Sequence, residues 1–181
     1  MRSSSSAFLL LALLTAAITP PNVLSQQVRR AVAVDSCLPP SEFQLRGVAL
    51  TSLSSMARKT LGPPLRVKTG TGEDDGGRYE VQTFHYRDLE FEDVRGFVDR
   101  LETHSPQVTT PSGLQVGLSF EAVQQNLLGQ GVRVPASADT IRVPICPAPD
   151  TSEVTGPEGD MALVFDKTRH VVTLLMEAAR P

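Results

Sequence analysis

Three histidines, His85, His104 and His170, are the residues of this 181-residue chain best suited to acid–base chemistry near neutral pH. A hydrolase could use such an imidazole as the general base that activates a nucleophile. The sequence contains no Gly-x-Ser-x-Gly elbow, and no histidine has a metal-ligating residue four positions later. We therefore expect no metal and no other cofactor. An envelope hydrolase that uses His85 or His170 remains the alternative function.

Two acidic segments could bind a cation or a basic partner. The Gly-rich stretch 69–77 is no phosphate loop, because its carboxylates would repel phosphate and no Lys-Ser or Lys-Thr pair follows. Calcium suits such oxygen ligands better, but the alternating spacing of an EF-hand is missing. We interpret this stretch and the stretch 150–160 as surface loops. Their candidate partner-facing residues are Glu73, Asp74, Asp75, Glu153, Glu158 and Asp160.

The two cysteines, Cys37 and Cys146, form an even pair. In an exported chain such a pair can oxidise, so we expect a disulfide that ties the N-terminal arm to the distal part of the chain. It would close a loop of about 110 residues, which the chain-entropy argument makes strongly stabilising. A redox-active pair and two free buried thiols are the alternatives.

The N-terminus has the pattern of a secretory signal peptide. Arg2 precedes the apolar run 7–18, whose twelve residues are too few to span a bilayer as a helix. Prolines and small residues follow, so we expect cleavage after Ser25 and a signal peptide over residues 1–25. An uncleaved N-terminal anchor is the alternative. No cysteine near the junction could carry a lipid. We expect a periplasmic or secreted protein with no stable membrane insertion.

Charge and composition exclude several classes of partner. Without Arg2, 16 basic residues remain against 20 acidic ones, and no basic cluster stands out. A mildly acidic surface argues against nucleic acid and anionic lipid. Tryptophan is absent and aromatic residues are few, which disfavours stacking platforms for bases or sugars.

Two segments predict amphipathic helices of similar design. In the first, Ser52 is the expected N-cap and Gly62 the stop, with an apolar stripe between them. In the second, 67 residues later, Ser119 is the expected N-cap and Gly129 the stop. The two stripes consist of Leu53, Met56, Ala57 and Leu61, and of Phe120, Val123, Leu127 and Leu128.

Each predicted helix is followed by strand-like segments of period two. These segments are 78–86, 89–94 and 97–103 in the first half, and 161–166 and 171–176 in the second. The recurrence predicts an α+β fold of two tandem units, each with a helical element packed on a small antiparallel sheet. We place an N-terminal arm at 26–46, the units at 47–106 and 113–181, and a connector at 107–112.

The stretch from Thr110 to Ser119, which runs directly into Leu128-Gly129, resembles the small periplasmic domains of the BamE/SmpA/OmlA and β-lactamase-inhibitor-protein type. The resemblance implies helices on an antiparallel sheet and a binding role without catalysis. The chain departs from the pattern by lacking a lipidated cysteine and any recognisable partner-binding sequence. No binding residue can be carried over.

These observations favour an exported protein-binding module without catalytic activity, whose partner is a protein of unknown identity. Apolar anchors would supply the affinity, and the charged loops would tune the encounter. Besides the hydrolase, a carrier of a ligand or lipid is a third hypothesis, and it would need an apolar cavity between the sheets.

Overall fold

A computed structural model describes residues 31–33, 36–147 and 158–179 of the chain. Most of its elements are strands, and eight of them form one sheet in the order β1-β8-β9-β10-β7-β6-β5-β4. The sheet strands are β1 Ala31–Ala33, β4 Arg66–Asp74, β5 Gly77–His85, β6 Glu90–Val94, β7 Phe97–Thr103, β8 Thr140–Pro144, β9 Gly159–Phe165 and β10 Val171–Ala178. Seven of them are antiparallel to their neighbours, and β1 joins β8 in parallel.

The expectation of two tandem units, each with its own small sheet, is wrong. Strand β7 from the first half pairs with β10 from the second, with Leu101 opposite Met176 and Arg100 opposite Glu177. This pairing joins the strands of both halves into one ladder, so neither half has a sheet of its own. The described part of the chain is mostly β, with two short α-helices.

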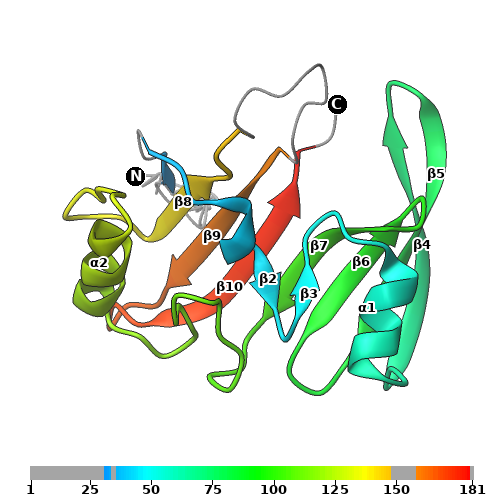
Figure 1. The fold of residues 1–181 in the computed structure, drawn as a ribbon, viewed down its shortest axis with the longest axis horizontal. Helices are drawn as coiled ribbons and strands as arrows, with labels where there is room; N and C mark the ends of the chain where they lie inside the picture. The colour runs from blue at the N-terminus through cyan, green and yellow to red at the C-terminus, as the bar shows by residue number, and fades with distance from the viewer. Residues whose placement is uncertain (1–30, 34–35, 148–157, 180–181) are drawn as a thin grey trace, which may run out of the picture.

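One face of the sheet carries the core. Alternation along the strands places large apolar side chains on this face, including Phe91, Leu101 and Met176, all of which are buried. The covering elements are the short hairpin β2 Gln44–Leu45 and β3 Val48–Ala49, helix α1 Ser54–Leu61 and helix α2 Phe120–Gly129. In Figure 1, α1 and α2 lie at the two ends of the molecule with the β2–β3 hairpin between them. Most of the buried apolar residues form a single cluster.

The two helices begin differently. Ser119 is the N-cap of α2, and its hydroxyl accepts a hydrogen bond from the Ala122 amide at 3.3 Å. Ser52, in contrast, does not cap α1, so that prediction is wrong. Its hydroxyl donates to the Ala49 carbonyl at 2.6 Å, and its backbone carbonyl accepts from Val98 of β7. Leu53 occupies the N-cap position instead.

The helix ends also differ. Gly62 ends α1 with a φ of +79°, a left-handed conformation that glycine adopts without strain. Gly129, the predicted stop of the second helix, is instead the last residue of α2. The left-handed residue there is Gly131, with a φ of +82°, and Val132 donates back to the Leu127 carbonyl at 2.9 Å.

The Gly-rich stretch 69–77, predicted as a loop, is largely a strand. β4 pairs with β5 without interruption from Arg66 opposite His85 to Asp74 opposite Gly77. Tyr79 covers Gly72, where an added Cβ would approach the phenol ring to 2.5 Å. A cross-strand aromatic ring thus compensates for a glycine that weakens a strand on its own.

The predicted disulfide is confirmed: Cys37 and Cys146 are bonded, with their Cα atoms 4.8 Å apart. Next to the bond, Leu38 donates to the Pro144 carbonyl and Cys146 donates to the Leu38 carbonyl. The arm is thereby attached to the end of β8. The 3-10 helix η1 Pro40–Glu42 follows it.

Neither α-helix of the described part of the chain is long and apolar enough to cross a bilayer. The predicted signal peptide 1–25, its cleavage site and Glu153 lie outside the described residues.

Candidate functional site

The face of the sheet opposite the core carries a network of charges. Arg100 on β7 forms ion pairs with Glu102, with Glu92 at 3.5 Å and with Glu177 at 3.9 Å. On the far side of Glu177, Arg142 of β8 reaches that carboxylate at 3.7 Å. Carboxylates and guanidinium groups therefore pair across β6, β7, β10 and β8, although the buried Nε atom of Arg100 has no hydrogen-bond partner among the described residues.

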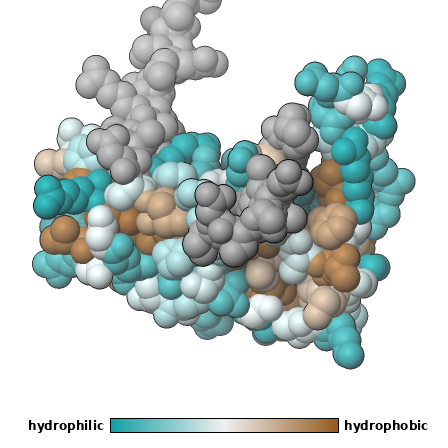
Figure 2. Space-filling view, turned by 45° about the horizontal axis from the view of Figure 1, so that its top comes forward, coloured by the Kyte–Doolittle hydropathy of each residue, from teal (hydrophilic) through white to brown (hydrophobic). Residues whose placement is uncertain are grey.

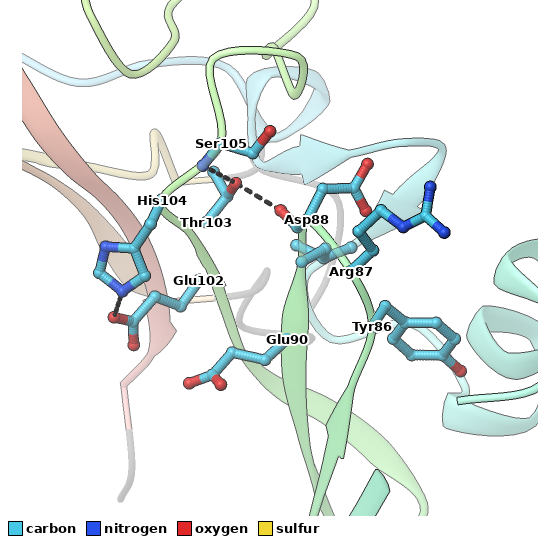
Figure 3. Close-up of a pocket in the computed structure, with 9 residues that line it drawn as sticks. Tyr86, Arg87, Asp88, Glu90, Glu102, Thr103, His104 and Ser105 are labelled. Atoms are coloured by element: carbon cyan, nitrogen blue, oxygen red, sulfur yellow. Dashed lines mark hydrogen bonds and ion pairs between the residues drawn. The ribbon is translucent and has the colours of Figure 1, made fainter. Parts of the chain in front are cut away.

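A shallow depression of about 200 Å³ lies beside the start of β6 and the end of β7. Glu90 and Glu102 stand directly opposite each other there, and their side chains point the same way (Figure 3). Like charges in this position destabilise a sheet unless they are compensated. His85 approaches Glu90 at 2.8 Å and His104 approaches Glu102 at 2.9 Å, so each carboxylate has its own imidazole.

This arrangement does not form a nucleophile–base pair. Both ring nitrogens of His104 are engaged, Nε2 with Glu102 and Nδ1 with the Val172 carbonyl and the Thr173 hydroxyl, each at 3.1 Å. The Nε2 atom of His85 is buried and has no hydrogen-bond partner among the described residues. Ser105 lines the depression, but its hydroxyl accepts from the Gln107 amide.

His170, the other residue named for a hydrolase, lies in the exposed turn between β9 and β10. Its ring contacts the Thr168 hydroxyl at 3.1 Å, and that hydroxyl donates to Asp166. The His170 amide and then the Thr168 side chain hold the pKa of Asp166 below its usual 3.8. These contacts all fall within one five-residue turn and stabilise the turn itself.

Within the described residues, no group of three or more His, Cys, Asp or Glu side chains could hold a metal ion. The polar tyrosine beside the depression, Tyr86, is tied to α1: its hydroxyl donates to the Gly62 carbonyl at 3.3 Å. Burial raises the pKa of Tyr86, and the nearby Arg58 partly opposes that rise.

The acidic residues expected to face a partner are not equivalent. Glu73 and Asp75 are exposed at the tip of the β4–β5 hairpin, whereas Asp74 accepts from the Gly76 amide at 2.9 Å and pairs with Arg95 at 3.0 Å. Asp160, predicted in a loop, lies instead in β9 and pairs with Arg142 at 2.8 Å. Glu158 is exposed just before β9. Of these residues, Asp74 and Asp160 already have partners within the chain.

The first half of the molecule also exposes large apolar side chains. Leu53, Met56 and Phe97, here called the apolar patch, are 47%, 62% and 50% exposed. An isolated bridge pairs Leu53 with Phe97, which brings their side chains together. Met56 lies three residues after Leu53 and therefore on the same side of α1.

Leu53 and Met56 were predicted as members of one apolar stripe that also includes Ala57 and Leu61. In the structure, α1 turns its small residues Ser54 and Ala57 inward, and both are buried. The stripe is therefore divided: Ala57 and Leu61 pack on the core while Leu53 and Met56 are exposed. A stripe of apolar residues does not by itself reveal which side of it another element will cover. Phe97 was predicted only as the first residue of the strand-like segment 97–103.

No family model matches the chain. No curated protein matches it either. Among solved structures, the chain is similar to the crystal structure of an extracellular protein containing a SCP domain from Bacillus anthracis, with 16% identity and a TM-score of 0.44. That likeness covers 71% of this chain, which spans only 43% of the other.

The chain is also similar to the crystal structure of the uncharacterized protein yfeY from Escherichia coli, with 9% identity and a TM-score of 0.45. In that case 78% of this chain and 99% of the other are covered. Likenesses this distant carry no argument about function. The resemblance to the BamE/SmpA/OmlA and β-lactamase-inhibitor-protein domains stays a prediction.

Proposed function

We propose that this protein is an exported protein-binding module that contacts its partner through the apolar patch beside α1. The observation that carries the proposal is the exposure of Leu53, Met56 and Phe97 next to one another. Contiguous exposed apolar side chains cost solubility and typically mark surfaces that a partner covers. Aromatic residues and methionine are also enriched in the centres of protein–protein interfaces.

The surroundings of the patch suit a polar rim. Lys59 follows Met56 by one helical turn, and Arg95 precedes Phe97 in the β6–β7 turn; both side chains are exposed. Charges in this position govern the rate of encounter and the choice of partner more than the affinity. The acidic tip of the β4–β5 hairpin, with Glu73 and Asp75, would contribute in the same way.

Export is supported by the Cys37–Cys146 bond, because structural disulfides form and persist mainly in oxidising compartments. The predicted signal peptide points the same way. Together they favour the periplasm or the outside of the cell as the place where the partner is met.

The test compares two single variants of equal chemistry. Met56→Asp places a charge in the apolar patch, and Leu128→Asp places one at a side chain of similar exposure, 60%, on α2. Tagged wild type and both variants are used to capture proteins from the exported fraction of the source cells. Binding of each captured protein is then measured directly by calorimetry.

We expect Met56→Asp to weaken binding of the partner by about a hundredfold, the size of a hot-spot loss, while Leu128→Asp leaves it unchanged. Equal binding by wild type and both variants would refute the role of the patch. A thermal melt of each variant verifies that both remain folded.

A further inference from the structure

The sheet has two unlike edges. One edge strand, β1, is only three residues long. The other, β4, is nine residues long, pairs with β5 alone and has seven of its nine residues exposed. The β4–β5 hairpin extends beyond the rest of the sheet in Figure 1, and in Figure 2 it stands out as a hydrophilic arm. The outer side of β4 thus offers unpaired backbone donors and acceptors.

Proteins usually protect such an edge by shortening it, placing charged side chains on it, interrupting it with proline, kinking it with a bulge or covering it. Among the described residues, the charged side chains at its two ends are the one such protection that β4 has. Its pairing with β5 runs through nine consecutive residue pairs without a register shift, and its sequence contains no proline. An exposed regular strand of this length can accept another strand by backbone hydrogen bonding.

The hairpin is also preorganised, which lowers the entropic cost of pairing. Tyr79 packs over Gly72, and Arg95 lies over the Tyr79 ring at 5.1 Å from its centroid. The same Arg95 holds Asp74 at 3.0 Å. β4 is therefore fixed in an extended shape by contacts on its own hairpin and the β6–β7 turn.

The order of charges along β4 specifies what could pair with it. Arg66 and Lys68 stand at the start, Glu73 and Asp74 at the end, and the centre 69–72 is uncharged. An antiparallel copy of this strand brings each basic end beside the acidic end of the other, whereas a parallel copy would place like charges together. Charge order thus selects an antiparallel copy.

We propose that a second copy of this chain pairs with β4 antiparallel through its own β4, about a two-fold axis at Gly70. In this register Arg66 lies opposite Asp74 of the second copy. An added Cβ at Gly70 would meet nothing within 4 Å, so the face of the strand at its centre is uncovered. The dimer leaves the apolar patch out of the pairing, so it does not rest on the proposed partner-binding function.

Two reciprocal charge reversals test the pairing. The basic end is reversed by Arg66→Glu with Lys68→Glu, and the acidic end by Glu73→Lys with Asp74→Lys, so that the reversed Arg66 and Asp74 positions face each other in the mixture. Because Asp74 also holds the hairpin turn, Asp74→Ala, which loses the same turn contacts without reversing the charge, is measured beside it. The control is Arg133→Glu with Lys167→Glu, a change of equal charge at two exposed residues of the second half. Sedimentation velocity over a concentration series reports the dimerisation constant.

We expect wild type and control to dimerise alike, each reversal alone to dimerise at least about tenfold more weakly, and a mixture of the two reversals to form a heterodimer. Restored association in the mixture would establish that both reversed proteins are folded. A wild type that stays monomeric throughout, or reversals that dimerise as well as wild type, would overturn the proposal.

A cysteine at the axis tests the register independently of charge. The two native cysteines are bonded to each other, so Gly70→Cys adds a single free thiol. Under mild oxidation we expect a disulfide-linked dimer on a non-reducing gel. Gly129→Cys, an equally open glycine on α2, should remain largely monomeric. Equal cross-linking of both variants would count against an axis at Gly70.

Discussion

Helices α1 and α2 cover the same face of one sheet, yet they contribute to the molecule in different ways. α2 buries Phe120, Val123 and Leu127, and its first turn is capped by its own Ser119. α1 buries only Ser54 and Ala57 and leaves Met56 in solvent. α2 therefore belongs to the core, whereas α1 leaves large apolar side chains exposed on the surface.

The start of α1 depends on its neighbours rather than on its own sequence. Ser54 donates its amide to the Gly96 carbonyl at 3.0 Å, and its hydroxyl donates to Asp93 at 2.5 Å. Asp93 also accepts from the Gly96 amide at 2.8 Å. One carboxylate on β6 therefore joins the β6–β7 turn to α1 and so positions Leu53 beside Phe97. Two similar local sequences differ in structure because different elements surround them.

The two helices should differ most in how much their apolar side chains contribute to the free energy of unfolding. Phe120→Ala removes a fully buried ring whose centroid lies 5.1 Å from that of the Phe165 ring. This change should lower the free energy of unfolding by about 4 kcal/mol. Met56→Ala in the exposed patch should change it by less than about 0.5 kcal/mol. Urea unfolding followed by circular dichroism measures both. Similar losses would mean that α1 is as much a core element as α2.

The disulfide should stabilise the half that contains α2, because it fixes the arm at the end of β8. Replacing both Cys37 and Cys146 with serine should cost about 3 kcal/mol. Hydrogen exchange should then show the largest loss of protection in β8 and β9, with α1 less affected. A uniform loss through the whole sheet would show that the bond acts mainly on the unfolded chain.

The source of each helix cap provides a third comparison. Asp93→Ala leaves the buried Ser54 hydroxyl without its partner and should cost about 2 kcal/mol. Ser119→Ala removes a single cap hydrogen bond and should cost about 1 kcal/mol. Thermal or urea unfolding ranks the two variants. The reverse order would contradict the dependence of α1 on the β6–β7 turn.

The smallest expected effect is a dependence of stability on pH, which we expect from α2 and not from α1. The backbone amide of Glu121, and then the Ser119 hydroxyl, hold the pKa of the exposed Glu121 below its usual 4.5. Because the folded state has the lower pKa, this stabilisation is present above 4.5 and is lost as the pH falls through the folded value.

Glu121→Gln should therefore lower the urea midpoint slightly at neutral pH and not at all in strong acid. The first turn of α1 contains no acidic residue, so Ser55→Gln serves as a control in α1 without this dependence. A difference between Glu121→Gln and wild type that persists in strong acid would contradict the assignment.

Several elements could be predicted from local sequence. Strands β5, β6 and β7 and the last two strands, β9 and β10, match their period-two segments. Ser119 lies where a cap was expected, because capping involves residues only three apart. β4 was missed since four of its residues, from Thr69 to Gly72, are threonines and glycines with no apolar alternation. Its partner β5 supplies the order that its own sequence lacks.

The candidate site was predicted only in part. Leu53 and Met56 were recognised as members of one apolar stripe, but their exposure was not. Phe97 is the first residue of β7, 41 residues after Met56, and the pairing of Leu53 with Phe97 joins it to them. The acidic residues were also predicted only in part. Asp160 was predicted in a loop, whereas the structure places it in β9.

By itself, the sequence determined the features that depend on short separations: strand periodicity, the cap of α2, the left-handed end of α1, and a cysteine pair free to oxidise. The tertiary structure alone decided that β7 pairs with β10 to make one sheet, that β4 is an open edge, and that Leu53 and Met56 beside α1 face solvent. The reason is physical. Periodicity records which residues share a side of a strand or helix, whereas burial and strand pairing depend on distant segments packing against that side.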